Sequence, residues 1–188
     1  MIRTFQIALV NKVPAGSREY FNYSTQNEIT YTLWEHLVPI AVAASGFIPG
    51  PSWSLRAANL QPHDVVVYFV PDPSSSVTTR AGTGGPRGST LGGFTTTSPR
   101  GVVCEVYVDG NLPARRLANI AFHEIMHNKL DVGTRTLSDL HRQGGGGLAR
   151  PPTEQWTSLT RENVAIMARH LFLRVPQYTG FMPTTRSR

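Results

Sequence analysis

Three side chains near the middle of the chain have the types and the spacing of a catalytic metal site. His123 and His127 lie four residues apart in the stretch HEIMH, and Glu124 directly follows the first histidine. If this stretch is helical, both imidazoles project from the same side, one turn apart, and can bind a single ion. Glu124 is then rotated by about 100° from His123 and can approach the ion without binding it. The pattern favours a metal site over a solvated helix face.

Zinc is the metal that these residue types favour. Two imidazoles and a third nitrogen or oxygen ligand leave one tetrahedral position for water. The ion lowers the pKa of this water to about 7 and polarises a carbonyl group. Glu124 would accept the proton of the water as a general base and later deliver it to the leaving amine. This is the chemistry of peptide-bond hydrolysis, so the expected substrate is a protein or a peptide.

The surrounding sequence predicts an α+β fold, with a small mixed β-sheet packed with helices. Runs rich in apolar and β-branched residues indicate strands, and apolar residues at helical spacing indicate helices. We expect strands at residues 2–10, 63–70 and 102–110, and helices at 25–47, 112–130 and 159–175. Thr25 with Glu28 forms a capping-box pattern at the first helix, and Thr160 is the expected cap of the last.

The helix that carries the histidines is expected to be amphipathic. Its apolar stripe, which would face the sheet, consists of Ala118, Ala121, Phe122 and Ile125. His123 and His127 are displaced from this stripe, so they can reach an ion outside the core. The Gly-, Ser-, Thr- and Pro-rich stretch at 71–101 is either a flexible surface loop or the rim of a substrate groove.

With this motif the chain resembles the zincin metallopeptidases, whose signature is HExxH. The resemblance implies His123 and His127 as zinc ligands and Glu124 as the general base. The expected order of elements is also similar to the metzincin branch, in which an upper lobe with a sheet and two helices precedes a short lower lobe. It implies one zincin-like metalloprotease domain over residues 1–188, with the upper lobe at 1–130 and the lower lobe at 131–188.

The third ligand departs from the metzincin pattern HExxHxxGxxH. In HEIMHNKLDVG, Leu130 replaces the glycine and Gly133 stands where the third histidine belongs. We expect His141 to replace it, because the intervening chain can turn back toward the helix and the four glycines at 144–147 permit a close backbone approach. In a second zincin branch, a glutamate on a later helix completes the site. The alternatives that stay open are Asp131, Asp139, Glu154 and Glu162.

Two residues of the C-terminal part invite roles that the resemblance suggests. Metzincins place a methionine turn beneath the metal, and Met167 could serve, although a methionine on an apolar helix face is more often a core residue. Tyr178 could stabilise a tetrahedral oxyanion, as a tyrosine does in some relatives, although half-buried packing is commoner for such a residue. The remaining histidines are expected at the surface or in hydrogen bonds rather than at the metal: His36, His63 and His170.

Composition narrows the class of protein. A length of 188 residues favours one domain, and the single cysteine, Cys104, excludes an internal disulfide and a Cys-based zinc site and is expected to be buried. No apolar run has the roughly 18–20 residues of a membrane span, and no secretory signal is evident. We therefore expect a cytoplasmic protein or export without a cleaved signal. The formal charge is +6, but the arginines are scattered, so nucleic-acid binding is not expected.

The sequence thus predicts a zinc-dependent peptidase or a related amide hydrolase. The alternative is a non-catalytic zincin-like module, or a structural metal-binding domain within a larger assembly. Glu124 separates the two hypotheses, because a structural site fills its fourth position with protein and needs no neighbouring glutamate. The substrate, the cleavage preference and the oligomeric state do not follow from the sequence.

Overall fold

The computed structural model describes eight stretches of the chain. They are residues 2–16, 21–53, 64–71, 93–95, 103–108, 112–130, 146–149 and 158–171.

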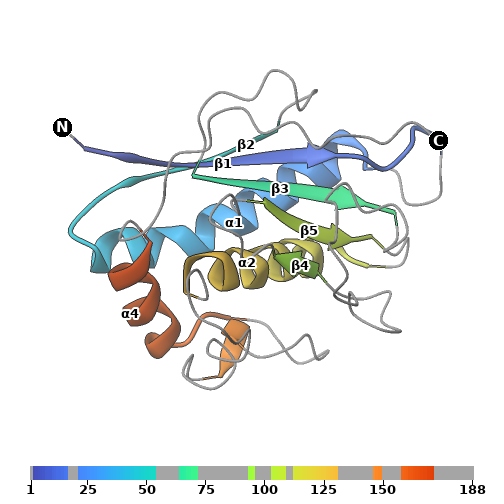
Figure 1. The fold of residues 1–188 in the computed structure, drawn as a ribbon. Helices are drawn as coiled ribbons and strands as arrows, with labels where there is room; N and C mark the ends of the chain where they lie inside the picture. The colour runs from blue at the N-terminus through green and yellow to red at the C-terminus, as the bar shows by residue number, and fades with distance from the viewer. Residues whose placement is uncertain are drawn as a thin grey trace.

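A five-stranded mixed sheet forms one layer of the described structure (Figure 1). Its strand order is β2-β1-β3-β5-β4. Neighbouring pairs among β1, β2, β3 and β5 are parallel, and β4 runs antiparallel to β5. The strands are β1 (Thr4–Asn11), β2 (Ile48–Trp53), β3 (Val65–Val70), β4 (Gly93–Thr95) and β5 (Val103–Tyr107). Parallel neighbours need crossover connections, and the first helix supplies the one between β1 and β2.

The helices form a second layer against one face of this sheet (Figure 1). Helix α1 (Tyr23–Ala43) packs against β2, and α2 (Ala114–Leu130) packs against β5 and β4. The two helices also pack against each other, and α4 (Arg161–His170) packs against both of them. A short 3-10 turn, η3 (Gly147–Ala149), lies against α2 and α4.

The core lies between the sheet and the helices. Alternate strand residues point into it, as the two-residue period of a strand requires. The fully buried contributors include Phe5, Ile7, Leu9, Val65, Val67, Phe69, Cys104 and Val106 from the strands and Ile29, Leu33, Leu37, Phe122 and Ile125 from the helices. The opposite side of the sheet is buried as well, at Ala8, Val10, Val66, Tyr68, Glu105 and Tyr107. Burial on both faces is usual for parallel strands.

The expected fold class is confirmed at this level: a small mixed sheet packed with helices. The predicted strands near 2–10, 63–70 and 102–110 and all three predicted helices are present. Two strands were not predicted. β2 was missed because its sequence, IPGPSW, is rich in turn-forming residues, and β4 lies within the stretch that was expected to be irregular.

The predicted start of the first helix was wrong, whereas that of the last is confirmed. Asn22, not Thr25, is the N-cap of α1, and its Oδ1 accepts from the backbone N of Thr25 at 2.8 Å. Thr160 caps α4, and Asn163 completes a capping box there. Among the described residues, no helix is both long and apolar enough to cross a membrane.

Candidate metal centre

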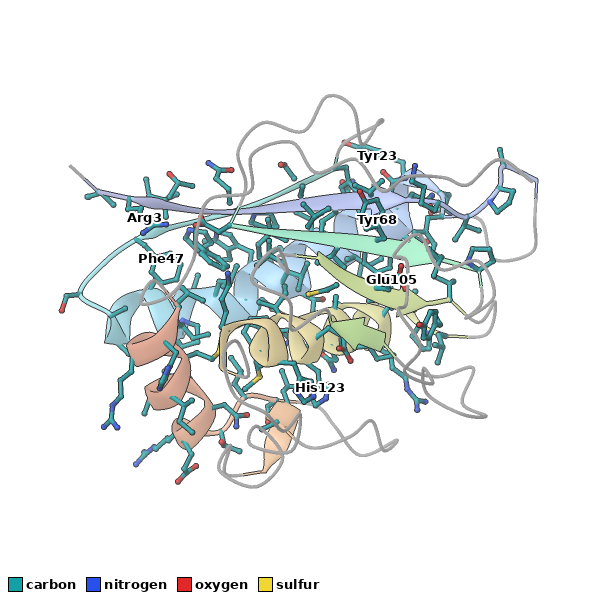
Figure 2. All side chains as sticks on the ribbon, in the orientation of Figure 1. Arg3, Tyr23, Phe47, Tyr68, Glu105 and His123 are labelled. Atoms are coloured by element: carbon teal, nitrogen blue, oxygen red, sulfur yellow. The ribbon has the colours of Figure 1, made fainter. Side chains whose placement is uncertain are left out.

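Helix α2 carries all three residues of the HEIMH motif that could do chemistry. The expected apolar stripe on this helix is completely buried, at Ala118, Ala121, Phe122 and Ile125. Packing of this stripe against the sheet and α1 fixes the rotation of the helix about its axis. His123 lies on the side of α2 that faces away from the sheet (Figure 2). The core therefore sets the direction in which the motif points.

The two imidazoles of the motif converge. The Nε2 atoms of His123 and His127 are 3.0 Å apart, and the rings lie at 90° with centroids 4.5 Å apart. Two zinc–nitrogen bonds of about 2.0–2.1 Å that diverge from one ion at between a right angle and a tetrahedral angle separate their nitrogens by about 2.9–3.4 Å. The observed separation fits one shared ion. It also suits a hydrogen bond from His127 Nε2 to His123 Nε2, which holds the rings together without an ion.

A backbone carbonyl determines which nitrogen of His123 carries the proton. The Nδ1 atom lies 2.6 Å from the carbonyl oxygen of Leu148 in η3. A carbonyl oxygen only accepts, so Nδ1 donates its hydrogen and Nε2 of the neutral ring keeps its lone pair. Metal-binding histidines commonly have such a partner on the second nitrogen, which orients the ring and raises its basicity. His123 could therefore bind an ion through Nε2.

The motif is shielded from solvent on most sides. Only 3% of His123, 7% of Glu124 and 7% of His127 is exposed. Charges and dipoles interact more strongly at such a position than in water, because the local dielectric constant is lower. Glu124 directly follows His123 in the sequence and shares this buried setting, in which a carboxylate could accept and release a proton.

The third ligand stays a prediction. In the part of the chain that the structure describes, no group of three His, Cys, Asp or Glu side chains could hold a metal ion. Glu162 is described, and it lies exposed in the first turn of α4. The favoured candidate and three of its rivals lie outside the described residues: His141, Asp131, Asp139 and Glu154.

The other residues considered from the sequence have structural surroundings. Met167 is fully buried in the core on α4, as expected of a core methionine. His36 is buried between α1 and α2 and is hydrogen-bonded, with its Nε2 2.8 Å from Asn119 Oδ1. His170 is half-buried at the end of α4, and Cys104 is buried, as expected. His63 and Tyr178 lie outside the described residues.

A buried lysine near the C-terminus of α2 was not predicted from the sequence. Lys129 Nζ donates to the backbone oxygen of Asp64 at 2.9 Å and lies 5.3 Å from the centroid of the Phe5 ring. Burial lowers its pKa to about 8. Asp64 in turn accepts from the Arg3 guanidinium at 2.8 Å and from the backbone N of Gln6 at 2.9 Å. This cluster connects the end of α2 to the beginning of β3.

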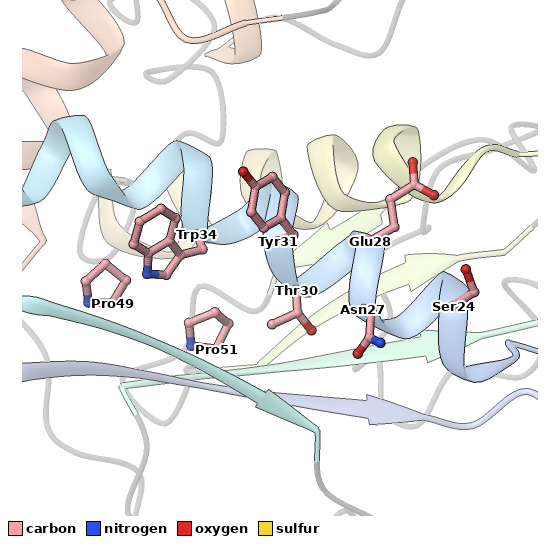
Figure 3. A pocket seen from close by; sticks show the side chains of 8 residues that line it. All are labelled: Ser24, Asn27, Glu28, Thr30, Tyr31, Trp34, Pro49 and Pro51. Carbon is pink, nitrogen blue, oxygen red and sulfur yellow. The ribbon is translucent and has the colours of Figure 1, made fainter.

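A separate hollow of about 700 Å³ lies between α1 and β2 (Figure 3). Its lining consists of Ser24, Asn27, Glu28, Thr30, Tyr31, Trp34, Pro49 and Pro51. None of these residues comes from α2, so the hollow does not belong to the histidine pair.

No protein-family model, no curated protein and no solved structure matches this chain.

Proposed function

We propose that the protein is a zinc-dependent metallopeptidase of the zincin type. His123 and His127 would hold the ion, with His141 as the third ligand, and Glu124 would be the general base. The observation that carries this proposal is the 3.0 Å separation of the two Nε2 atoms of His123 and His127. The Nδ1 atom of His123 is at the same time hydrogen-bonded to the Leu148 carbonyl. Two histidines on a solvated helix surface would need neither the close approach of their Nε2 atoms nor a carbonyl partner for Nδ1.

The side chains fit the ion chemically. The separation of the two Nε2 atoms is one that a single zinc ion can bridge. Both histidines are also largely buried, whereas histidines on a solvated helix surface would be exposed. When bound, zinc polarises a carbonyl oxygen and makes a neighbouring water more acidic.

Glu124 supplies the proton transfers of the proposed reaction. Its carboxylate accepts a proton from the attacking water while the water oxygen bonds to the peptide carbonyl carbon. The same carboxyl group then delivers that proton to the amide nitrogen as the C–N bond breaks. The products are a carboxylic acid and an amine, and Glu124 returns to its starting state.

The arrangement of elements also supports the proposal. The resemblance to metzincins implies a sheet and two helices followed by a short C-terminal part. Here the sheet with α1 and α2 precedes η3 and α4, and both of these later elements pack onto α2.

The Glu124→Gln variant tests the catalytic assignment. We expect it to retain about one zinc ion per chain and to lose peptide hydrolysis by about 10²–10⁴-fold, because glutamine cannot accept the proton. Zinc is measured by elemental analysis of the purified chain, and hydrolysis by mass spectrometry of a mixed peptide library. Glu28→Gln, an exposed residue on α1, is the matched control and should change neither quantity.

Three further variants test the ligands. His123→Ala, His127→Ala and His141→Ala should each lose zinc. Zinc that persists in the first two variants, or full activity in Glu124→Gln, would overturn the proposal. If zinc is retained in His141→Ala but lost in the other two variants, the third ligand would instead be Asp131, Asp139, Glu154 or Glu162. Zinc binding without hydrolysis of any peptide would favour the alternative of a non-catalytic metal-binding module.

A further inference from the structure

The capping box of α4 extends beyond its own helix. Asn163 is completely buried, and it exchanges two hydrogen bonds with Thr160. The backbone N of Thr160 donates to Asn163 Oδ1 at 3.2 Å, and the backbone N of Asn163 donates to Thr160 Oγ1 at 3.1 Å. A capping box needs only the acceptor atom of the Asn163 side chain. The donor atom of this side chain, Nδ2, takes no part in the capping box.

That donor binds the turn that precedes α4 in the sequence. Asn163 Nδ2 donates to the carbonyl oxygen of Gly146 at 3.0 Å. The same oxygen accepts from the backbone N of Ala149 at 3.1 Å, which closes the η3 turn. Asn163 therefore holds the backbone of the Gly147–Ala149 turn in place.

Gly147 permits this close contact. Its φ of +54° is in the left-handed region, and an added Cβ would lie 2.7 Å from Thr160 Cγ2, 2.9 Å from Asn163 Oδ1 and 2.9 Å from the Ser158 carbonyl oxygen. Only glycine fits such a position without displacing backbone. The turn thus lies directly against the N-terminus of α4.

The next residue of the turn contacts the metal motif. The carbonyl oxygen of Leu148 accepts from His123 Nδ1 at 2.6 Å, while the Leu148 side chain is fully buried in the core. From Asn163 to His123 the connection therefore needs only two hydrogen bonds and a short piece of backbone. The neutral imidazole has two tautomers, and only the one with its hydrogen on Nδ1 leaves Nε2 free to bind an ion.

We propose that Asn163 is a positioning residue of the metal centre. By donating to Gly146, it holds the Gly147–Ala149 turn where the Leu148 carbonyl fixes the orientation and the tautomer of His123. This inference rests on the proposed function, in which His123 binds zinc through Nε2. It gives α4 a role in the site, although the proposal requires no ligand from that helix.

The Asn163→Asp variant separates this role from capping. Aspartate keeps an oxygen that can accept from Thr160 N, and its charge is favourable in the first turn of a helix. It loses the Nδ2 donor and places a carboxylate against the Gly146 carbonyl. We expect the zinc dissociation constant, measured by competition with a chelator, to rise by about 10–100-fold. In the metal-free variant, the ¹⁵N shifts of His123 should show loss of the Nδ1–H tautomer.

The Thr160→Ala variant is the matched control. It removes the capping oxygen and leaves the Nδ2–Gly146 hydrogen bond in place, so Tm should fall by about 2–4 °C with the zinc affinity and the His123 tautomer unchanged. If Asn163→Asp does not fold, Gly147→Ala displaces the same turn and should give the same two effects.

The outcomes distinguish this inference from the proposed function. Wild-type zinc affinity and an unchanged tautomer in Asn163→Asp, with zinc lost in His123→Ala, would overturn the role of Asn163 and leave the peptidase proposal intact. Zinc retained in His123→Ala and His127→Ala would overturn the proposed function. The tautomer of His123 in the metal-free protein would still decide whether Asn163 positions the ring.

Discussion

Two buried histidines of this protein are held in opposite tautomers. His123 donates from Nδ1 to the carbonyl of Leu148, which leaves Nε2 as the acceptor nitrogen. His36 has its Nε2 2.8 Å from Asn119 Oδ1, so Nε2 is the donor and Nδ1 keeps the lone pair. In each case an oxygen acceptor decides the proton position. At His123 this arrangement places the lone pair of Nε2 3.0 Å from the Nε2 atom of a second histidine, His127.

His36 should make the stability of the protein depend on pH. Burial between α1 and α2 lowers its pKa below the usual 6.5, and Arg115 adds to this effect, whereas the bond to Asn119 and the nearby Glu35 oppose it. The unfolded chain therefore takes up a proton at a higher pH than the folded one. The contribution of His36 is complete above about pH 6.5 and is lost as the pH falls toward the lowered value.

Urea unfolding of the wild type and of His36→Gln between about pH 5 and pH 8 measures this contribution. Glutamine can donate to Asn119 but does not titrate. The wild type should be the more stable at neutral pH, and the two free energies of unfolding should approach each other as the solution becomes acidic. Parallel curves across the whole range would contradict the assignment.

At this scale the sequence indicated the side chains but not their partners. His123, Glu124 and His127 could be recognised because residue type and spacing carry the chemistry. The Leu148 carbonyl could not, because every residue has such an oxygen and no residue type marks the one that is used. The only hint was the run of four glycines before it, of which Gly147 does allow a close backbone approach.

Among the elements, α1 shows how a cap can be misplaced from sequence. Thr25 was expected as the cap because Glu28 follows it at the right spacing, but the helix begins at Tyr23. Asn22 has the extended backbone of an N-cap, with φ −75° and ψ 173°. Thr25 Oγ1 donates to Asn22 Oδ1 at 3.1 Å instead of accepting from a backbone N. Asparagine and threonine both suit the position, so the pattern alone could not decide between them.

Alanine substitutions at these two positions distinguish the caps. Asn22→Ala should lower the free energy of unfolding by about 1 kcal/mol, because it leaves the backbone N of Thr25 without its acceptor. Thr25→Ala should cost clearly less, since it removes only a bond between exposed side chains. Both values come from urea denaturation at one pH. A larger loss in Thr25→Ala than in Asn22→Ala would show that the cap is at Thr25 after all.

Strand composition explains the remaining differences between expectation and structure. β3 was predicted because all six of its residues, Val65–Val70, are apolar or aromatic, and the structure shows all six buried. In β5, Glu105 and Tyr107 carry polar groups, yet both are completely buried. Local patterns report what a residue prefers, whereas the burial of this face depends on the assembled tertiary structure.

For the whole molecule, the candidate centre joins distant parts of the chain. The histidine pair comes from α2, after the sheet is complete, and the carbonyl that orients His123 comes from residue 148. Helix α4 donates from Asn163 to the Gly146 carbonyl of the same turn and also packs against α1. The site therefore depends on docking of the C-terminal elements onto α2, which the motif alone does not reveal.

The sheet has an outer strand, β2, whose free edge is blocked by proline. The backbone N of Ile48 donates to the backbone O of Arg3, the residue before β1, and Ile48 is paired with Thr4 in the sheet. Residues 48, 50 and 52 therefore direct their peptide groups inward, toward β1. Pro49 and Pro51 alternate with these and therefore face outward, where they offer no N–H. Among the described strands none pairs with this edge. Proline on an edge strand prevents another chain from adding to the sheet.

The double variant Pro49→Thr, Pro51→Thr restores two outward N–H groups in a residue type that favours strands. We expect it to self-associate as its concentration rises, because the new donors can pair with the edge of a second molecule. Sedimentation velocity over a range of concentrations measures this. Ser52→Thr is the matched control, since it raises strand propensity at a residue whose N–H already faces β1. A double variant that sediments like the wild type at every concentration would show that other features keep this edge from pairing.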